Sequence, residues 1–135
     1  MRVTVWLVLL LGCSSELPGP AQIAWGSESC ASCRMVISDK RFSAQIVSPS
    51  HDPIFFDEID CLAKWVAAHP LSDDSRVFVS DYSDSGWIPA REASWFRCRN
   101  VATPMNSGLI AARRTGTAAS CPKLEASQLF GRKLP

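Results

Sequence analysis

Three sulfur-bearing side chains occur within six residues, in the segment Cys30-Ala31-Ser32-Cys33-Arg34-Met35. Thiolate and thioether sulfurs are soft ligands that favour copper(I), whereas zinc prefers thiolate together with imidazole or carboxylate. If Cys33 to Met35 begins a strand, residues two apart point to the same face, so both sulfurs could contact one ion. A copper(I) site is therefore one hypothesis for this segment.

The same residues allow two other interpretations. A CxxC pair such as Cys30 and Cys33 is also typical of redox dithiols. Such a dithiol normally opens a helix after a strand, whereas here the polar run 26–29 precedes the pair and a strand pattern follows it. Alternatively, Cys30 and Cys33 form a structural disulfide and Met35 fills a core. Residue types alone leave the three interpretations open.

The remaining cysteines have no metal-like spacing. Cys61 lies in a helical pattern, and a free cysteine behaves as a small apolar residue, so we expect a buried thiol there. Cys98 and Cys121 could pair in an oxidising compartment, which would contribute about 3 kcal/mol in the chain-entropy model. The sequence leaves that pairing undecided. His51 and His69 are the only two imidazoles and are expected at the surface.

The N-terminus has the features of an export signal. Met1-Arg2 is followed by a run of nine mostly apolar residues, Val3 to Leu11, which is too short to span a hydrocarbon core. The next residues complete Leu10-Leu11-Gly12-Cys13, which resembles a bacterial lipobox. We therefore expect a signal peptide over 1–12, lipid on Cys13, a flexible spacer over 13–29 and one folded domain over 30–135. Ser14 after the lipidated cysteine favours the outer membrane, on its periplasmic side.

Composition narrows the classes of partner and activity. Fourteen basic and thirteen acidic residues give the 135-residue chain a formal charge of +1. That balance gives no electrostatic reason to expect nucleic acid as a partner. The sequence supports no Ser-His-Asp or Cys-His nucleophile arrangement, so we expect a protein that is not an enzyme.

Hydrophobic patterns predict the elements that must position the sulfurs. Strand patterns cover 35–38, 43–47 and 54–56, and a helix that Asp57 could cap follows up to Pro70. The second half has strands at 76–80 and 108–112 and a short helix over 122–130, with no clear pattern at 87–102. This order, strands followed by a helix and then repeated, predicts an α+β fold in which small antiparallel sheets pack against helices.

Three motifs resemble the NosL family of copper-binding lipoproteins, which are associated with nitrous oxide reductase maturation. Residues 30–45 resemble the opening of that family, 56–65 its FDD segment and following helix, and 103–111 its PMGSG segment. The resemblance implies a copper(I) chaperone with two ββα-type units and with Cys33, Met35 and Met105 as ligands. Cys30 could be an auxiliary ligand. Its partner would be a copper-enzyme acceptor or the assembly machinery of that enzyme, such as a membrane ABC-type complex.

Two positions depart from the family pattern. Arg34 replaces the glycine of the family's CGM motif, and Asn106 replaces the glycine that follows its Pro-Met pair. Neither change removes a sulfur, but each puts the loop geometry and the partner surface in question. The alternatives to a chaperone are a thiol–disulfide oxidoreductase that uses Cys30 and Cys33, or a structural lipoprotein.

Overall fold

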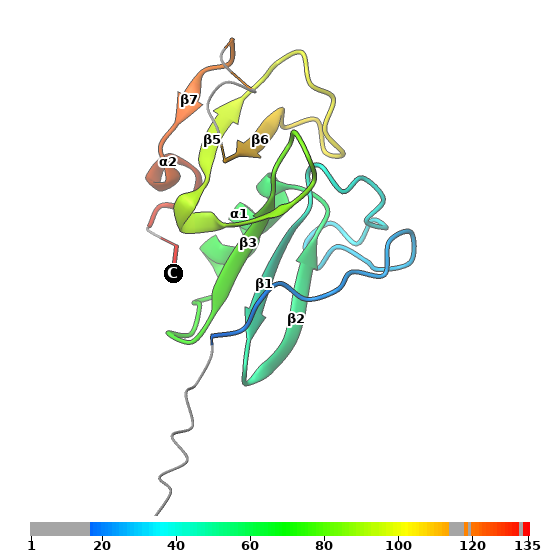
Figure 1. Ribbon diagram of the computed structural model, residues 1–135, viewed down its shortest axis with the longest axis vertical. Coiled ribbons are helices and arrows are strands. Elements are labelled where there is room, and N and C mark those ends of the chain that lie inside the picture. The colour runs from blue at the N-terminus through cyan, green and yellow to red at the C-terminus, as the bar shows by residue number, and fades with distance from the viewer. Residues whose placement is uncertain (1–16, 114–117, 119, 133) are drawn as a thin grey trace, which may run out of the picture.

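The computed structural model describes the chain except for residues 1–16, 114–117, 119 and 133. The expected signal peptide and Cys13 therefore lie outside the described residues. In chain order, the elements are β1 Ala44–Ser48, β2 His51–Phe56, α1 Ile59–Ala68, β3 Arg76–Ser80, β4 Trp87–Pro89, the 3₁₀ helix η1 Ala90–Glu92, β5 Ser94–Arg97, β6 Leu109–Ala112, β7 Lys123–Leu124 and α2 Ala126–Phe130 (Figure 1). In the described part of the chain, no helix is both long and apolar enough to cross a membrane.

The strands form two small antiparallel sheets. One sheet has four strands in the order β2-β1-β3-β4, and the other has three in the order β6-β5-β7. The expected α+β class is thus confirmed. Because β3 pairs with β1, the first sheet combines strands from both halves of the chain.

Helix α1 covers one face of the four-stranded sheet, behind the strands in the view of Figure 1. Its buried residues, Ile59, Cys61, Leu62 and Val66, recur at helical spacing. They join one core cluster with Ala44 and Ile46 of β1 and with Val77 and Val79 of β3. Each pair of strand residues is two apart and so faces the same side of the sheet.

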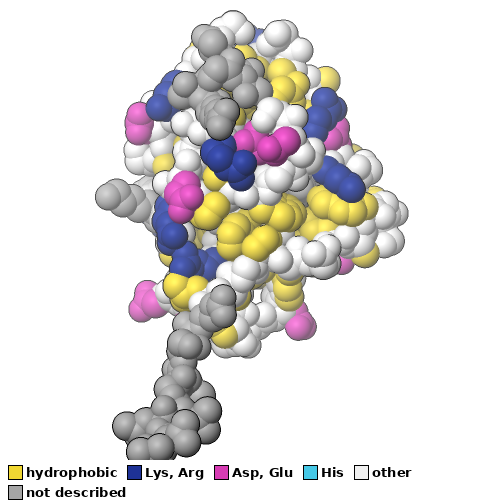
Figure 2. Space-filling view, viewed as in Figure 1, with side chains coloured by type: hydrophobic (Ala, Val, Ile, Leu, Met, Phe, Trp, Pro, Cys, Tyr) yellow, Lys and Arg dark blue, Asp and Glu magenta, His cyan; other side chains and the backbone are white. Residues whose placement is uncertain are grey.

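The segment before the first strand lies against the other side of β1. Gln45 points away from the α1 core, is fully buried, accepts a hydrogen bond from the Ala21 N–H (2.7 Å) and donates one to the Ala21 carbonyl (3.2 Å). Ile23 is also buried. Hydrophobic side chains gather in the middle of the molecular face shown in Figure 2. Residues 21–23, which fall within the expected spacer, therefore contact the sheet.

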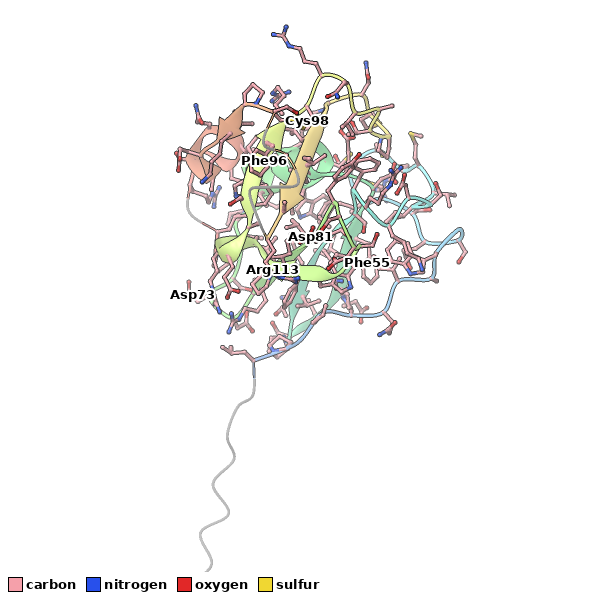
Figure 3. All side chains as sticks on the ribbon, turned by 45° about the horizontal axis from the view of Figure 1, so that its top comes forward. Phe55, Asp73, Asp81, Phe96, Cys98 and Arg113 are labelled. Atoms are coloured by element: carbon pink, nitrogen blue, oxygen red, sulfur yellow. A yellow bond between two sulfur atoms is a disulfide. The ribbon has the colours of Figure 1, made fainter. Side chains whose placement is uncertain are left out.

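The two sheets are joined beside Asp81. Residues Asp81 and Ala111 form an isolated parallel bridge, and the backbone N–H of Arg113 donates a hydrogen bond to Asp81 Oδ2 at 3.0 Å. Asp81 and Arg113 lie close together in Figure 3. The second sheet has its own smaller core around Phe96 and Ile110.

The structure decides the pairing of the two later cysteines. Cys98, directly after β5, and Cys121, just before β7, form a disulfide with their Cα atoms 5.0 Å apart (Cys98 is labelled in Figure 3). Cys98 is buried in the second core. Cys98 and Cys121 are 23 residues apart in the sequence, and the disulfide holds both of them at the same sheet.

Several predicted boundaries are wrong. The strand expected at 35–38 is reduced to one bridge between Ser29 and Val36, because the preceding residues form a tight turn. Glu58, not Asp57, is the N-cap of α1, and no side chain caps that helix. The last helix begins only at Ala126, because Lys123 and Leu124 pair with β5 instead.

Candidate metal centre

A tight loop presents Cys30 and Cys33. The Cys30 N–H donates to the Met35 carbonyl at 2.8 Å, and the Arg34 N–H donates to the Cys30 carbonyl at 3.0 Å. The Ala31 N–H donates to the carbonyl of Phe55 in β2 at 2.9 Å, which fixes the loop to the sheet. Cys33 to Met35 is therefore part of a turn, and the strand geometry on which the sequence argument relied is wrong.

Helix α1 adds a third sulfur to this loop. Cys61 lies in the first turn of α1, and the Sγ atoms of Cys30, Cys33 and Cys61 all lie within 4.8 Å of one another. Among the described residues, no other group of three or more His, Cys, Asp or Glu brings its ligand atoms so close. Cys30 and Cys61 are buried and Cys33 is partly exposed, so the cluster reaches the surface on one side.

Hydrogen bonds favour a thiolate at Cys30. The Cys61 thiol donates to the Cys30 sulfur, and this bond, together with the peptide N–H groups of Cys33, Asp57 and Ser32, lowers the pKa of Cys30 to about 4, although burial opposes the shift. Hydrogen bonds to the charged form of a group stabilise that form. The loop and the start of α1 thus provide a ready-made site for one negative sulfur.

The pKa values of the other two sulfurs are shifted in the opposite direction. Burial raises the pKa of the Cys33 thiol above its ordinary value. The hydrogen bond that Cys61 donates to Cys30, reinforced by burial, raises the pKa of Cys61 strongly. A metal ion that bound all three sulfurs would displace the protons that their thiols carry.

The spacing of the cluster suits a three-coordinate soft ion. With metal–sulfur bonds of about 2.3 Å, a trigonal arrangement places the sulfurs about 4 Å apart. The three Sγ atoms, within 4.8 Å of one another, are close to that arrangement. The cluster is therefore compatible with copper binding.

The predicted methionine ligands lie at the surface. Met35 is 49% exposed and Met105 is 40% exposed. The Met105 N–H donates to Glu58 Oε2 at 3.0 Å, and Glu58 is the N-cap of the helix that bears Cys61. The structure thus attaches the Met105 loop to the element that completes the sulfur cluster. That Cys33, Met35 and Met105 share one ion stays a prediction.

The two departures from the family pattern have a common conformational property. Arg34 and Asn106 both adopt left-handed backbone conformations, with φ of 67° and 57°. Glycine adopts that region without strain, which accounts for the family's glycine at both positions. Gly108 is needed for space as well, because a Cβ there would lie 2.7 Å from the Cys98 carbonyl oxygen.

Two buried carboxylates lie beside the cysteines. Burial, then the negative Cys30, raises the pKa of Asp57 to about 6. Asp57 and Glu58 are almost inaccessible to solvent, and Asp57 Oδ1 and Glu58 Oε1 have no hydrogen-bond partner. None of the ion pairs between described residues includes either carboxylate. The cluster therefore lies in a locally negative region.

Sequence reasoning found part of this arrangement. Cys61 is buried, as expected, but its place beside Cys30 was missed. The sequence marks Asp57 as a possible helix cap, but it does not indicate that Asp57 and Glu58 are both buried. The position of Cys61 depends on the contact between the Cys30 loop and β2, and no local pattern signals that contact.

The chain resembles known proteins over most of its length. The family model NosL matches residues 21–126. Among solved structures, the crystal structure of the copper chaperone NosL from Shewanella denitrificans matches with a TM-score of 0.67 and 17% sequence identity, over 82% of this chain and 96% of that one. At that identity the likeness concerns the fold. No curated protein matches the chain.

Proposed function

This chain belongs to the NosL family, and from that premise we propose that it is a copper(I) chaperone that acts outside the cytoplasm. It receives copper(I) through sulfur ligands and passes the ion to a copper enzyme, with nitrous oxide reductase assembly as the destination. The observation that carries the proposal is the cluster of three cysteine sulfurs, which is open to the surface only at Cys33. The Shewanella denitrificans protein, a copper chaperone of the same fold, supports it.

Transfer proceeds by ligand exchange at the exposed side of the site. Cys33 holds the ion together with the thioethers of Met35 and Met105, both of which are accessible to an approaching protein. An acceptor sulfur or imidazole enters the copper coordination while one thioether leaves. Cys33 keeps the ion until the exchange is complete.

The geometry argues against the oxidoreductase alternative. Such enzymes need an accessible cysteine whose thiolate is the nucleophile. Here the sulfur with the lowered pKa, Cys30, is fully buried, and the accessible sulfur, Cys33, has a raised pKa. Neither cysteine lies in a helix. We therefore propose that this chain is not an enzyme.

The membrane anchor and partner follow from the lipobox-like segment and the family. Lipid on Cys13 would hold the chain on the periplasmic side of a membrane, beside acceptor machinery such as an ABC-type complex. When the chain is expressed with its own leader in a bacterium, Cys13→Ala should move it from the membrane fraction to the soluble or unprocessed fraction. Unchanged partitioning would contradict the anchor.

Copper binding by the full chain tests the central proposal. The protein, purified in detergent with a reductant, should take up one copper(I) in competition with a chromogenic copper(I) chelator. Cys33→Ser should lose most of that binding, because Cys33 is the one cysteine of the exchange site and its thiol gives up its proton when copper binds. Val36→Leu is a matched control, since Val36 is an exposed apolar neighbour, 48% accessible, without sulfur. A parent chain that leaves all copper with the chelator would overturn the proposal.

A further inference from the structure

We propose that the chain holds copper(I) at two successive positions that share Cys33. The outer position, formed by Cys33, Met35 and Met105, exchanges the ion with other proteins. The inner position, formed by Cys30, Cys33 and Cys61, retains it. This inference rests on the proposed copper function and adds Cys61 as a ligand.

Proximity and burial separate the two sets of sulfurs. The sulfurs of the inner set lie within 4.8 Å of one another, and Cys30 and Cys61 are 0% and 1% exposed. The methionines of the outer set are 49% and 40% exposed. Cys33, with intermediate exposure, lies between these extremes and belongs to both sets. An ion that enters at the methionines therefore reaches the buried pair by exchanging ligands around one sulfur.

The backbone holds the inner set in place before any ion arrives. Hydrogen bonds from Cys30 N–H to the Met35 carbonyl and from Arg34 N–H to the Cys30 carbonyl close the loop. The Leu62 N–H donates to the Glu58 carbonyl at 3.2 Å, which forms the first turn of α1 around Cys61. Ligands held in this way need no ordering when the ion binds, which favours tight retention.

Local charge favours a cation at the inner position. Asp57 and Glu58 are buried directly before α1, each has one carboxylate oxygen without a hydrogen-bond partner, and neither forms an ion pair with another described residue. Burying unpaired negative groups is costly. A monovalent soft cation among the sulfurs lowers that cost and matches the ligand type.

Removing Cys61 tests the inner position without touching the outer one. We expect Cys61→Ser to bind one copper(I) still, but about 10- to 100-fold more weakly than the parent in chelator competition. It should also release the ion faster. Ile59→Val, a small buried change in the same helical turn without sulfur, is the control and should bind as the parent does. Equal affinities for all three proteins would overturn the inner position, while the copper function would stand.

A measurement on the unmodified chain keeps the test valid if the variant misfolds. The Cβ resonances of Cys30 and Cys61, followed by NMR in the reduced full chain, should shift when one equivalent of copper(I) is added. Unshifted Cys30 and Cys61 signals, with shifts confined to Cys33 and the methionine methyl groups, would refute the inner position. Failure of the parent to bind any copper would instead refute the proposed function.

Discussion

Met105 and Glu58, 47 positions apart in the chain, are joined by a hydrogen bond of 3.0 Å from the Met105 backbone N–H to Glu58 Oε2. Glu58 is fully buried and is the N-cap of α1, whose first turn bears Cys61. The Glu58 carboxylate therefore fixes the position of Met105, a predicted ligand of the outer position, relative to α1, the helix that bears Cys61.

Removing this carboxylate should release the Met105 loop. We expect Glu58→Ala to lower the free energy of unfolding by about 1–3 kcal/mol, the range for a buried donor left without its acceptor. Hydrogen exchange at the Met105 amide should accelerate in the same variant. Glu92→Ala, at an exposed glutamate that forms an ion pair with its neighbour Arg91, is the control and should change stability by less than about 0.5 kcal/mol. An unchanged Met105 exchange rate would show that the hydrogen bond does not hold the loop.

Alkylation should reveal the unequal reactivity of the three free cysteines. Iodoacetamide reacts with thiolates, and Cys33 is the accessible sulfur, so it should be modified before Cys30 and Cys61. Because its pKa lies above the ordinary 9.0, the reaction should be slow at pH 7 and should accelerate as the pH rises past 9. Mass spectrometry of the digested, metal-free protein reports each site. In guanidinium the three cysteines should react alike, and early modification of Cys30 at pH 6 in the folded chain would contradict this prediction.

The negative region beside the cysteines should affect stability in a pH-dependent way. In the folded chain the pKa of Asp57 is about 6, above its ordinary value of 3.8, so the folded state binds the proton more tightly than the unfolded state. Stability due to this group is therefore greatest below pH 4 and is lost as the pH rises through 6. We expect Asp57→Asn, which cannot ionise, to be about 3 kcal/mol more stable than the parent at pH 8.

The comparison must be made on metal-free, reduced protein at two pH values. Urea denaturation at pH 8 and pH 4 should show a stability gain for Asp57→Asn at the higher pH and little or none at the lower one. Asp52→Asn, on an exposed residue of β2, is the control and should show no such difference. A gain of equal size at both pH values would mean that the charge of Asp57 is not its cause.

The sequence indicated the elements more reliably than the contacts between them. Strand patterns at 43–47 and 76–80 predict β1 and β3 to within a residue, and helical spacing after Asp57 predicts α1. α1 buries residues at helical spacing, and β1 and β3 are short runs buried on both faces, so the local pattern is enough to find each of them. The strand expected at 35–38 does not form. Arg34 adopts a left-handed conformation, and hydrogen bonds between Cys30 and Met35 close a turn, and the local pattern indicates neither feature.

The candidate site was harder to predict than the fold. The CxM unit was visible because its residues are neighbours in the chain. The role of Cys61 was not visible, because its sulfur comes close to that of Cys30 only after β2 and α1 have packed against the loop. The burial of Asp57 and Glu58 was hidden for the same reason, since carboxylates before a helix are usually solvated. Long-range contacts of this kind leave no periodic signal.

The methionines should decide how quickly copper moves, and their contribution to affinity should appear only when the inner position is disabled. In the otherwise unmodified chain, Met35→Leu, a change of similar volume, should slow the transfer of copper(I) to a chelator with little loss of affinity, because Cys30, Cys33 and Cys61 still retain the ion. In Cys61→Ser, where the outer position alone remains complete, the same Met35→Leu change should weaken binding by about tenfold or more.

A double-mutant cycle of Met35→Leu and Cys61→Ser measures this dependence directly. Stopped-flow transfer to the chelator gives the rates, and equilibrium competition gives the affinities of the four proteins. The effects on affinity should be strongly non-additive, because each position compensates for loss of the other. Val36→Leu in both backgrounds controls for changes to the exposed apolar surface around Met35. Additive effects on affinity, with unchanged transfer rates, would mean that Met35 and Cys61 do not belong to two successive positions of one ion.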